Sequence, residues 1–247
     1  MNPLLYGELT PWYRLLDPTE DHADEAETYG DALVAAVDGE ARTLLELGSG
    51  AGNNAAFLRA RFDCTLTDLS PAMLALSRAL NPGCEHALGD MRDLRVGRTF
   101  DAVLCHDAVC YMATEADLRA AARTAFTHLR PGGAAVFAPD CVAEGFRDFS
   151  EHHEAAAGDR ALGCLAWTWD PDPGDSRYTV DYAFLLRHGD EVRAVHDRHE
   201  EGLFSRADWA RILSEVGFEV SEATRPLDDH DAASPYTDIF FVGRRPG

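Results

Sequence analysis

Residues 44–52 form an apolar run that ends in three closely spaced glycines, and few folds accommodate such a segment. They read Leu-Leu-Glu-Leu-Gly-Ser-Gly-Ala-Gly, and a helical pattern follows from Asn53 to Arg61. A strand that turns through Gly48 and Gly50 directly into a helix brings backbone amides close to a ligand. Asn53 stands where the dinucleotide fingerprint has its third glycine, which argues against NAD. The segment therefore predicts a turn that binds a different nucleoside.

Two acidic residues further along the chain support this interpretation. Asp68 ends the next predicted strand, where a carboxylate accepts hydrogen bonds from ribose hydroxyls. Gly89-Asp90-Met91 follows a third predicted strand, so Asp90 and the Met91 backbone would read an adenine edge while the Met91 side chain packs on the ring. The alternative is that Asp68 is a surface residue beside a tight turn and Asp90 a solvated loop residue.

The alternation of strands and helices predicts an α/β fold with a doubly wound, mostly parallel sheet. After residue 140 the pattern changes to strands separated by turn residues, which predicts an inserted antiparallel β subdomain. We expect an N-terminal cap over 1–38, a core over 39–140 and 201–247, and the insertion over 141–200. The expected strands are 43–47, 64–67, 100–105, 134–138, 165–169, 178–186, 192–199 and 239–242, and the expected helices are 21–37, 53–61, 71–80, 115–129 and 205–216.

The charge of the chain argues against several kinds of partner. Asp and Glu total 43 against 22 Lys and Arg, and the net charge of −21 repels both nucleic acid and anionic membrane surfaces. The same acidity could serve solubility alone. The six cysteines contain no Cys-x-x-Cys pair, which argues against disulfides and structural zinc. With no expected signal peptide or anchor, we predict a cytoplasmic protein.

Taken in order, these motifs resemble those of class I S-adenosylmethionine-dependent methyltransferases. The matching segments are Glu46-x-Gly48-x-Gly50-x-Gly52, Asp68, Gly89-Asp90-Met91 and Leu129-Arg130-Pro131-Gly132-Gly133. The resemblance implies a seven-stranded, mostly parallel, Rossmann-like sheet and S-adenosylmethionine as cofactor, with S-adenosylhomocysteine as product. It implies a cofactor site built from Tyr13, Glu46, Gly48, Ser49, Gly50, Asn53, Asp68, Leu69, Met73, Asp90, Met91, Cys105 and His106.

A narrower set of features is similar to the amino-sugar N,N-dimethyltransferases of macrolide pathways. It comprises Tyr6, Tyr13, the run 89–93, the antiparallel insertion and His199-x-x-x-Leu203-Phe204. The resemblance implies that the inserted strands form dimer contacts. It also implies a histidine after the fourth strand near the acceptor amine, and Tyr111 stands at the matching position here.

Methyl transfer needs alignment of donor and acceptor, and an amine or hydroxyl acceptor must also lose a proton. His106 and Tyr111 follow the fourth predicted strand, at the edge where open α/β sheets bind ligands, and are the first candidates for that role. Tyr13 and His199 are second candidates. Each has a purely structural alternative: cap packing for Tyr13, a cofactor wall for His106, a helix entry for Tyr111 and a buried sheet end for His199.

A metal site is not expected, because His196 and His199 would lie on opposite faces of one strand. Trp167, Trp169, Tyr182 and Phe184 alternate with polar residues, so we expect the apolar face of the insertion to cover the cofactor cleft, to meet a second subunit, or both.

The sequence therefore predicts a methyltransferase that acts on N or O of a small-molecule acceptor, with secondary metabolism as its expected setting. The alternative is a protein that keeps the cofactor fold without methylating, either as a binding protein or as an NAD-dependent oxidoreductase. The identity of the acceptor and the choice among N-, O- and C-methylation stay open.

Overall fold

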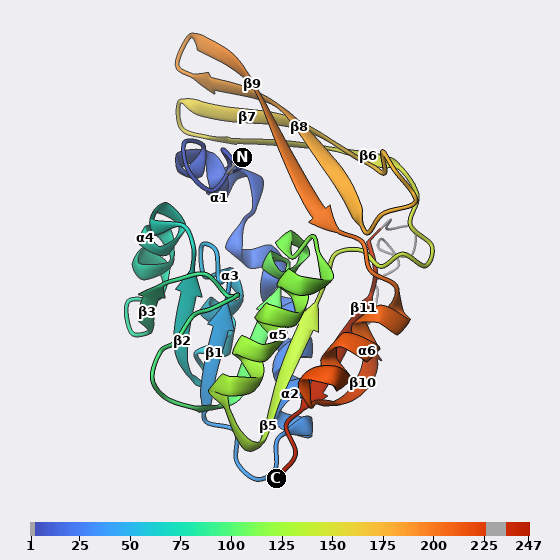
Figure 1. The fold of residues 1–247 in the computed structure, drawn as a ribbon. Helices are drawn as coiled ribbons and strands as arrows, with labels where there is room; N and C mark the ends of the chain where they lie inside the picture. Colours follow the sequence, from blue (N-terminus) through green and yellow to red (C-terminus); the bar gives the residue numbers. More distant parts are fainter. Residues whose placement is uncertain (1–2, 226–235) are drawn as a thin grey trace.

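The computed structural model describes residues 3–225 and 236–247, which form two sheets (Figure 1). The larger sheet has seven strands in the order β10-β11-β5-β4-β1-β2-β3, and the smaller has four in the order β6-β7-β8-β9. The strands of the larger sheet are β1 (Thr43–Leu47), β2 (Asp63–Asp68), β3 (Glu85–Leu88), β4 (Phe100–His106), β5 (Leu129–Ala138), β10 (Glu219–Thr224) and β11 (Ile239–Arg244). Those of the smaller sheet are β6 (Phe149–Ala157), β7 (Arg160–Trp169), β8 (Arg177–His188) and β9 (Glu191–Gly202).

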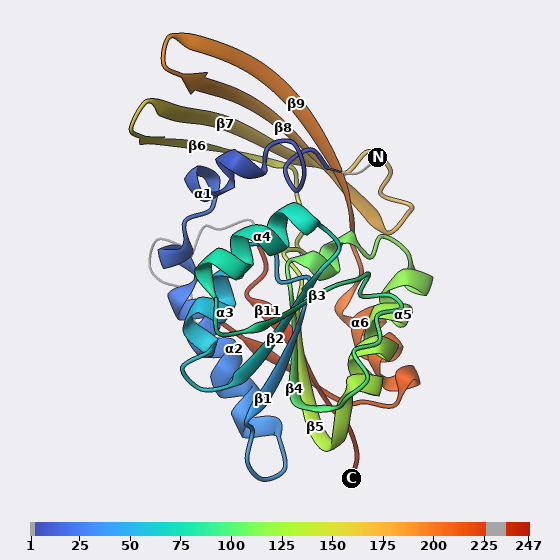
Figure 2. The ribbon, with the colours of Figure 1, turned by 90° about the vertical axis from the view of Figure 1, so that its left-hand side faces the viewer.

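Helices cover both faces of the large sheet (Figure 2). The strands β1 to β5 pair in parallel, and β11 pairs antiparallel with both β5 and β10. One buried cluster joins α2 and α3 to the sheet and another joins α5 and α6. This confirms the predicted doubly wound fold. The helices are α1 (Tyr13–Leu16), α2 (Ala23–Ala36), α3 (Asn53–Leu58), α4 (Pro71–Leu80), α5 (Glu115–His128) and α6 (Arg206–Val216), with short 3-10 turns η1 (Thr10–Trp12), η2 (Thr19–His22) and η3 (Ala108–Tyr111).

Local sequence accounts for where several helices begin. Ser70, Thr114 and Ser205 each accept a hydrogen bond from a backbone N–H in the first turn of α4, α5 and α6, and Pro71 adds a residue preset for helix at the start of α4. At the other end, Gly217 takes a left-handed conformation with φ 119° and closes α6. Among the described residues, every helix is too short or too polar to cross a membrane.

The structure corrects three expectations. The insertion has four strands where the sequence predicted three, and the additional strand is the edge strand β6. The edge strand β10 of the large sheet was not predicted either. Strand β5 begins at Leu129, since Leu129 pairs with Phe100 and the run 130–133 forms a register shift inside the ladder.

The four aromatic residues of the insertion do not share one face, which is the third correction. Trp167 lies opposite Asp181 and stacks on Trp169 on the outer face, where it is 54% exposed. Tyr182 and Phe184 point to the inner face and pack on the N-terminal segment. Because neighbouring residues of a strand alternate between faces, both faces of this sheet carry apolar side chains.

The inner face of the small sheet and the N-terminal segment lie over the carboxyl ends of the parallel strands (Figure 1). Leu5 and Leu9 are buried against Leu162, Phe184 and Leu186 in one apolar cluster. Two separate parts of the chain, the N-terminal segment and the inserted sheet, therefore cover the carboxyl ends of the strands of the large sheet.

Candidate functional site

The glycine-rich turn and Asp68 lie in direct contact. Gly48, Gly50 and Gly52 have φ of 73°, 53° and 78°, a region that glycine adopts without a Cβ clash. The N–H of Gly50 donates to Oδ2 of Asp68 at 2.9 Å, and the N–H of Ser70 donates to Oδ1 at 2.7 Å. Burial raises the pKa of Asp68, and these backbone donors counteract the rise. The carboxylate is thus fixed beside the turn, with acceptor capacity left for a ligand.

Glu46 lies at the end of β1 behind the turn and is only 4% exposed. Burial raises the pKa of its carboxyl to about 8. Within the described part of the chain its Oε2 has no hydrogen-bond partner, and the hydroxyl of Ser49 is likewise buried and unpaired. Unpaired buried acceptors are costly, so a ligand that donates hydrogen bonds here would be stabilised. An ammonium group is such a ligand.

The turn has an apolar wall. A Cβ built on Gly48 would lie 2.2 Å from the Cβ of Ala108 and 2.9 Å from Cε of Met91, so the backbone passes very close to these side chains. Cys105 is buried behind Met91, with the two sulfurs 3.7 Å apart, and burial raises the pKa of its thiol to about 12. Met73 is buried below Gly50, and Leu69 is exposed.

Asp90 does not present a free carboxylate. Arg92 donates to both of its oxygens, at 3.0 and 3.1 Å from Nε and 2.6 Å from Nη2, and this lowers the pKa of Asp90. Any contact from Asp90 to a ligand would therefore share an oxygen with Arg92.

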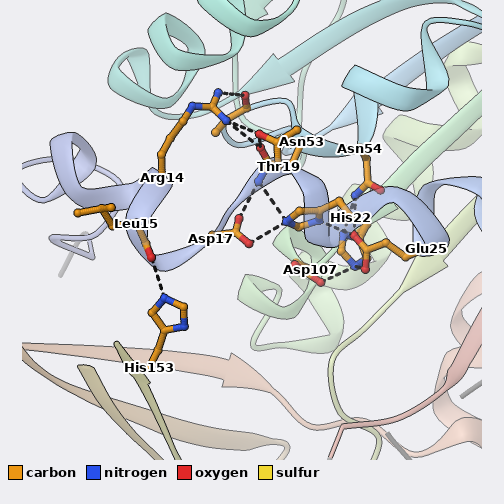
Figure 3. A network of polar contacts seen from close by, with 12 residues as sticks. Arg14, Leu15, Asp17, Thr19, His22, Glu25, Asn53, Asn54, Asp107 and His153 are labelled. Carbon is orange, nitrogen blue, oxygen red and sulfur yellow. Dashed lines mark hydrogen bonds and ion pairs between the residues drawn. The ribbon is translucent and has the colours of Figure 1, made fainter. Parts of the chain in front are cut away.

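Asn53, expected at the cofactor, is bonded to the N-terminal cap (Figure 3). Its Nδ2 donates to Asp17 at 2.8 Å, and its Oδ1 accepts from Arg14 at 3.2 Å and from Thr19 at 2.9 Å. His22 lies between Asp17, at 2.7 Å, and Glu25, at 2.6 Å. These contacts tie the cap to the first turn of α3, which follows the glycine turn.

His106 belongs to the same network instead of to the acceptor side. Its Nε2 is 2.7 Å from Asp107 and 3.3 Å from Glu25, and its Nδ1 is 3.1 Å from Asn54. Burial lowers the pKa of His106, but Asp107 and Glu25 outweigh it and raise the pKa well above its ordinary value. A protonated imidazole held between two carboxylates is a poor general base, so the geometry disfavours His106 in that role.

The histidine network predicts a pH-dependent stability. Burial lowers the pKa of His22, but Asp17 and Glu25 outweigh it and raise the pKa from 6.5 to about 10. A raised pKa means that the protonated form stabilises the fold; this contribution is complete below about pH 6.5 and is lost as the pH rises toward 10. We expect His22→Gln to lower the free energy of unfolding by about 1–3 kcal/mol at pH 6.5, and the deficit to shrink by pH 10.

Thermal unfolding of wild type and variant between pH 6 and 10 measures this difference. His188→Gln is the matched control, because the His188 side chain is 67% exposed beside Asp159 at a hairpin end. A His22 deficit that is constant with pH would contradict the expected charge coupling.

On the side of the site where the sequence leads us to expect the acceptor, Tyr111 and His199 meet as a hydrogen-bonded pair. The hydroxyl of Tyr111 is 2.7 Å from Nδ1 of His199, and the hydroxyl of Tyr6 is 2.8 Å from that of Tyr111. Nε2 of His199 is 3.1 Å from Oδ2 of Asp197, which also accepts the N–H of Leu5 at 2.8 Å. These contacts join the cap, the core and the insertion. His196 lies on the opposite face of β9 and bonds to Asp181, so it takes no part in them.

Three carboxylates lie around this pair. Asp107 follows β4, Asp140 follows β5 and Glu201 lies on β9 beside His199; oxygens of the last two lie within 4.8 Å of each other and of the Cys110 sulfur. Burial raises the pKa of Asp140 and of Glu201. Asp107 has φ 48°, the single positive value among non-glycine residues in the described segments. The acceptor side is therefore acidic and suits a ligand with N–H donors.

The model thus brings together most of the predicted residues, in two groups. Glu46, Gly48, Ser49, Gly50, Asp68, Met73 and Met91 surround the turn, and Tyr111 and His199 form the second group. Tyr13 lies between them, its ring centroid 6.5 Å from that of Tyr6. The sequence analysis missed Asp197 and the residues of the cap that bond to Asn53 and His106. The period of two along β9 puts Asp197 and His199 on one face, and this pattern would have located Asp197.

Comparisons with known proteins agree with this geometry. Residues 44–133 match a family model described as a methyltransferase domain. The dTDP-3-amino-3,4,6-trideoxy-alpha-D-glucopyranose N,N-dimethyltransferase of Streptomyces venezuelae is 37% identical over 203 residues, covering 81% of this chain and 85% of that protein.

Solved structures extend the similarity to nearly the whole chain. The sugar N-methyltransferase KedS8 from Streptoalloteichus has a TM-score of 0.83 at 27% identity, covering 97% of this chain and 93% of that one. CalS10 from Micromonospora echinaspora, an amino pentose methyltransferase solved with bound S-adenosylmethionine, has a TM-score of 0.79 at 26% identity and 96% coverage of both chains. The chain belongs to the class I S-adenosylmethionine-dependent methyltransferases, in the family of the amino-sugar N,N-dimethyltransferases.

Proposed function

We propose that this methyltransferase transfers methyl groups to the amine of a nucleotide-linked amino sugar. The observation that carries the proposal is the hydrogen-bonded group Tyr6, Tyr111 and His199, surrounded by carboxylates and placed over the carboxyl ends of β4 and β5. An amino sugar brings a cationic nitrogen with N–H donors, which matches that acidic side. The relative from Streptomyces venezuelae, like two further N,N-dimethyltransferases that are 29% and 31% identical to this chain, is named for an amino sugar linked to dTDP.

The residues around the glycine turn fit S-adenosylmethionine. We assign the ribose hydroxyls to Asp68, the ammonium of the amino-acid part to Glu46 and the backbone of 48–50, and the adenine ring to Met91 and Leu69. The orphan acceptor of Glu46 and the close passage of the backbone at Gly48 support this assignment. When bound, the sulfonium supplies an activated methyl group, and the task of these residues is to hold it and exclude water.

Cap and insertion complete the site in this proposal. The cap (1–38) supplies Tyr6 and Tyr13, the core (39–140 and 201–247) binds the cofactor, and the insertion (141–200) supplies Asp197 and His199 for the acceptor. We place the protein in the cytoplasm, without a nucleic-acid or membrane partner, because its charge is strongly negative and its six cysteines are free.

The test is a mass-shift assay with purified enzyme and S-adenosylmethionine. The acceptors are dTDP-linked 3-amino and 4-amino sugars, with the matching hydroxy sugars as controls. We expect two successive gains of one methylene mass on the amino sugars and none on the hydroxy sugars. Methylation of the hydroxy sugars alone would favour an O-methyltransferase, and transfer to neither would contradict the proposed acceptor.

We further propose a homodimer formed through the outer face of the small sheet. Leu165, Trp167 and Leu185 are each at least 50% exposed there, beside an open depression of about 660 Å³. A contiguous apolar surface of this kind is typical of an interface. We expect a dimer in light scattering at micromolar concentration, and Trp167→Glu should give a monomer. Val34→Glu, an exposed apolar position on α2, is the control that should stay dimeric. A monomeric wild type would contradict the proposal.

A further inference from the structure

We infer that Tyr6, Tyr111 and His199 form an oriented proton relay from the acceptor nitrogen, and that Asp197 is the positioning residue that sets its orientation at rest. The inference rests on the proposed amine acceptor. It concerns how the amine loses its proton. The proton must leave before the nitrogen lone pair can attack the methyl group.

The orientation of the relay follows from the groups at its buried end. Burial raises the pKa of Asp197, but the hydrogen bond from His199 and the N–H groups of Leu4 and Leu5 outweigh it and lower the pKa. Asp197 is therefore a carboxylate, which accepts hydrogen bonds and donates none. His199 Nε2, 3.1 Å away, must carry the hydrogen. In the neutral ring this leaves Nδ1 as the acceptor.

The remaining hydrogens are then fixed in turn. The hydroxyl of Tyr111 lies 2.7 Å from Nδ1 and also contacts Glu201; in the proposed relay it donates to Nδ1, so the hydroxyl of Tyr6, 2.8 Å from Tyr111, donates to the Tyr111 oxygen. Burial raises the pKa of both tyrosines, so each keeps its own proton at rest. The oxygen of Tyr6 is left with free lone pairs, at the outer end of the relay.

Tyr6 is anchored next to the cofactor side. Its carbonyl accepts a hydrogen bond from the Ser70 hydroxyl, and the N–H of Ser70 binds Asp68. His199, in contrast, has a fully buried side chain, packed under Tyr182 with ring centroids 4.8 Å apart. A proton that enters at Tyr6 therefore ends on an imidazole that water does not reach directly.

The proton balance of the relay closes without another reactant. The N–H bond of the acceptor ammonium breaks and its proton goes to the Tyr6 oxygen. The Tyr6 proton passes to Tyr111, and the Tyr111 proton passes to Nδ1 of His199. The products are a neutral amine and an imidazolium paired with Asp197. After methyl transfer, which leaves a new ammonium, the second cycle needs a neutral His199, whose proton returns along the same hydrogen bonds through Tyr111 and Tyr6 once the methylated product has left.

The first experiment reads the tautomer of His199 in the full-length protein without ligand. In ¹⁵N-histidine NMR, with the signal assigned through His199→Gln, we expect the Nε2–H form in the wild type. Asp197→Asn places an amide donor at Nε2 and should switch the ring to the Nδ1–H form, which turns the Tyr111 hydroxyl away from it. A wild-type Nδ1–H form, or the same tautomer in both proteins, would overturn the inference.

The second experiment measures single-turnover rates with the amino-sugar acceptor. Asp197→Asn and Tyr111→Phe should each lower the rate by about 10²- to 10⁴-fold with cofactor affinity unchanged in calorimetry. Asp159→Asn beside His188 is the matched control and should change neither the rate nor the tautomer of His199. Rates within threefold of wild type would overturn the relay.

The pH profile separates the relay from a structural role. Asp197, Glu201, Tyr182, Tyr111 and Tyr6 face His199 from the elements packed against it. Asp197→Asn should change the shape of the pH profile of the rate, because the relay loses the carboxylate that pairs with the proton it delivers, whereas a purely structural role would lower the rate equally at every pH. If the wild type methylates no amino sugar, the proposed acceptor fails, while the tautomer measurement still decides the geometry.

Discussion

Replacing Gly48 by alanine is expected to lower the free energy of unfolding by about 2–5 kcal/mol. The positive φ of 73° costs a residue with a Cβ about 1–2 kcal/mol. The new methyl group would also lie 2.2 Å from the Cβ of Ala108, a buried overlap that costs a further 1–3 kcal/mol or so. Urea unfolding of the two proteins measures the difference, and cofactor affinity should fall with it because the turn must shift.

Gly39→Ala is the matched control for this prediction. Gly39 has a similar φ of 83°, but nothing lies within 4 Å of a Cβ built there. This variant should show the backbone cost alone, about 1–2 kcal/mol. Equal effects at both positions would mean that the backbone at Gly48 does not pass as close to Ala108 and Met91 as the structure has it.

Replacing Asp68 by alanine is expected to weaken S-adenosylmethionine binding by at least about 100-fold. In the proposed site, the variant loses charge-assisted hydrogen bonds to the ribose hydroxyls, worth about 1.5–3 kcal/mol each. It also releases the N–H of Gly50, which Asp68 holds at 2.9 Å. Each 1.4 kcal/mol or so corresponds to a tenfold change in affinity. Isothermal titration calorimetry with the purified protein gives the result directly.

Asp63→Ala provides the control for Asp68, since Asp63 is exposed at the opposite end of the same strand. Its cofactor affinity should equal that of the wild type. Unchanged affinity in Asp68→Ala, with the fold intact by circular dichroism, would remove Asp68 from the ribose role.

The cofactor half of the site was predictable because its residues are adjacent in sequence to the elements that position them. A strand followed by glycines and a helix has few alternative structures, and Asp68 ends the neighbouring strand. Local patterns also located Ser70, Thr114 and Ser205 at helix starts.

The acceptor half was predictable only in part. Tyr111 and His199 were candidates, but their contact depends on how the small sheet packs over β4, and no local pattern encodes that packing. His106 shows the same limit, because Glu25, one of the two carboxylates that raise its pKa together with Asp107, comes from a distant helix. The edge strands β6 and β10 were missed because edge strands bury little and show weak alternation.

The hydrogen bond from Leu5 to Asp197 spans 192 positions of the chain. Contacts of such long range close last, because the entropy of a very large loop must be overcome first. A nascent polypeptide would therefore hold a complete glycine turn long before the proposed relay could form. In that proposal, the acceptor part of the site is completed in one late event of folding, when the segment around Leu5 meets β9.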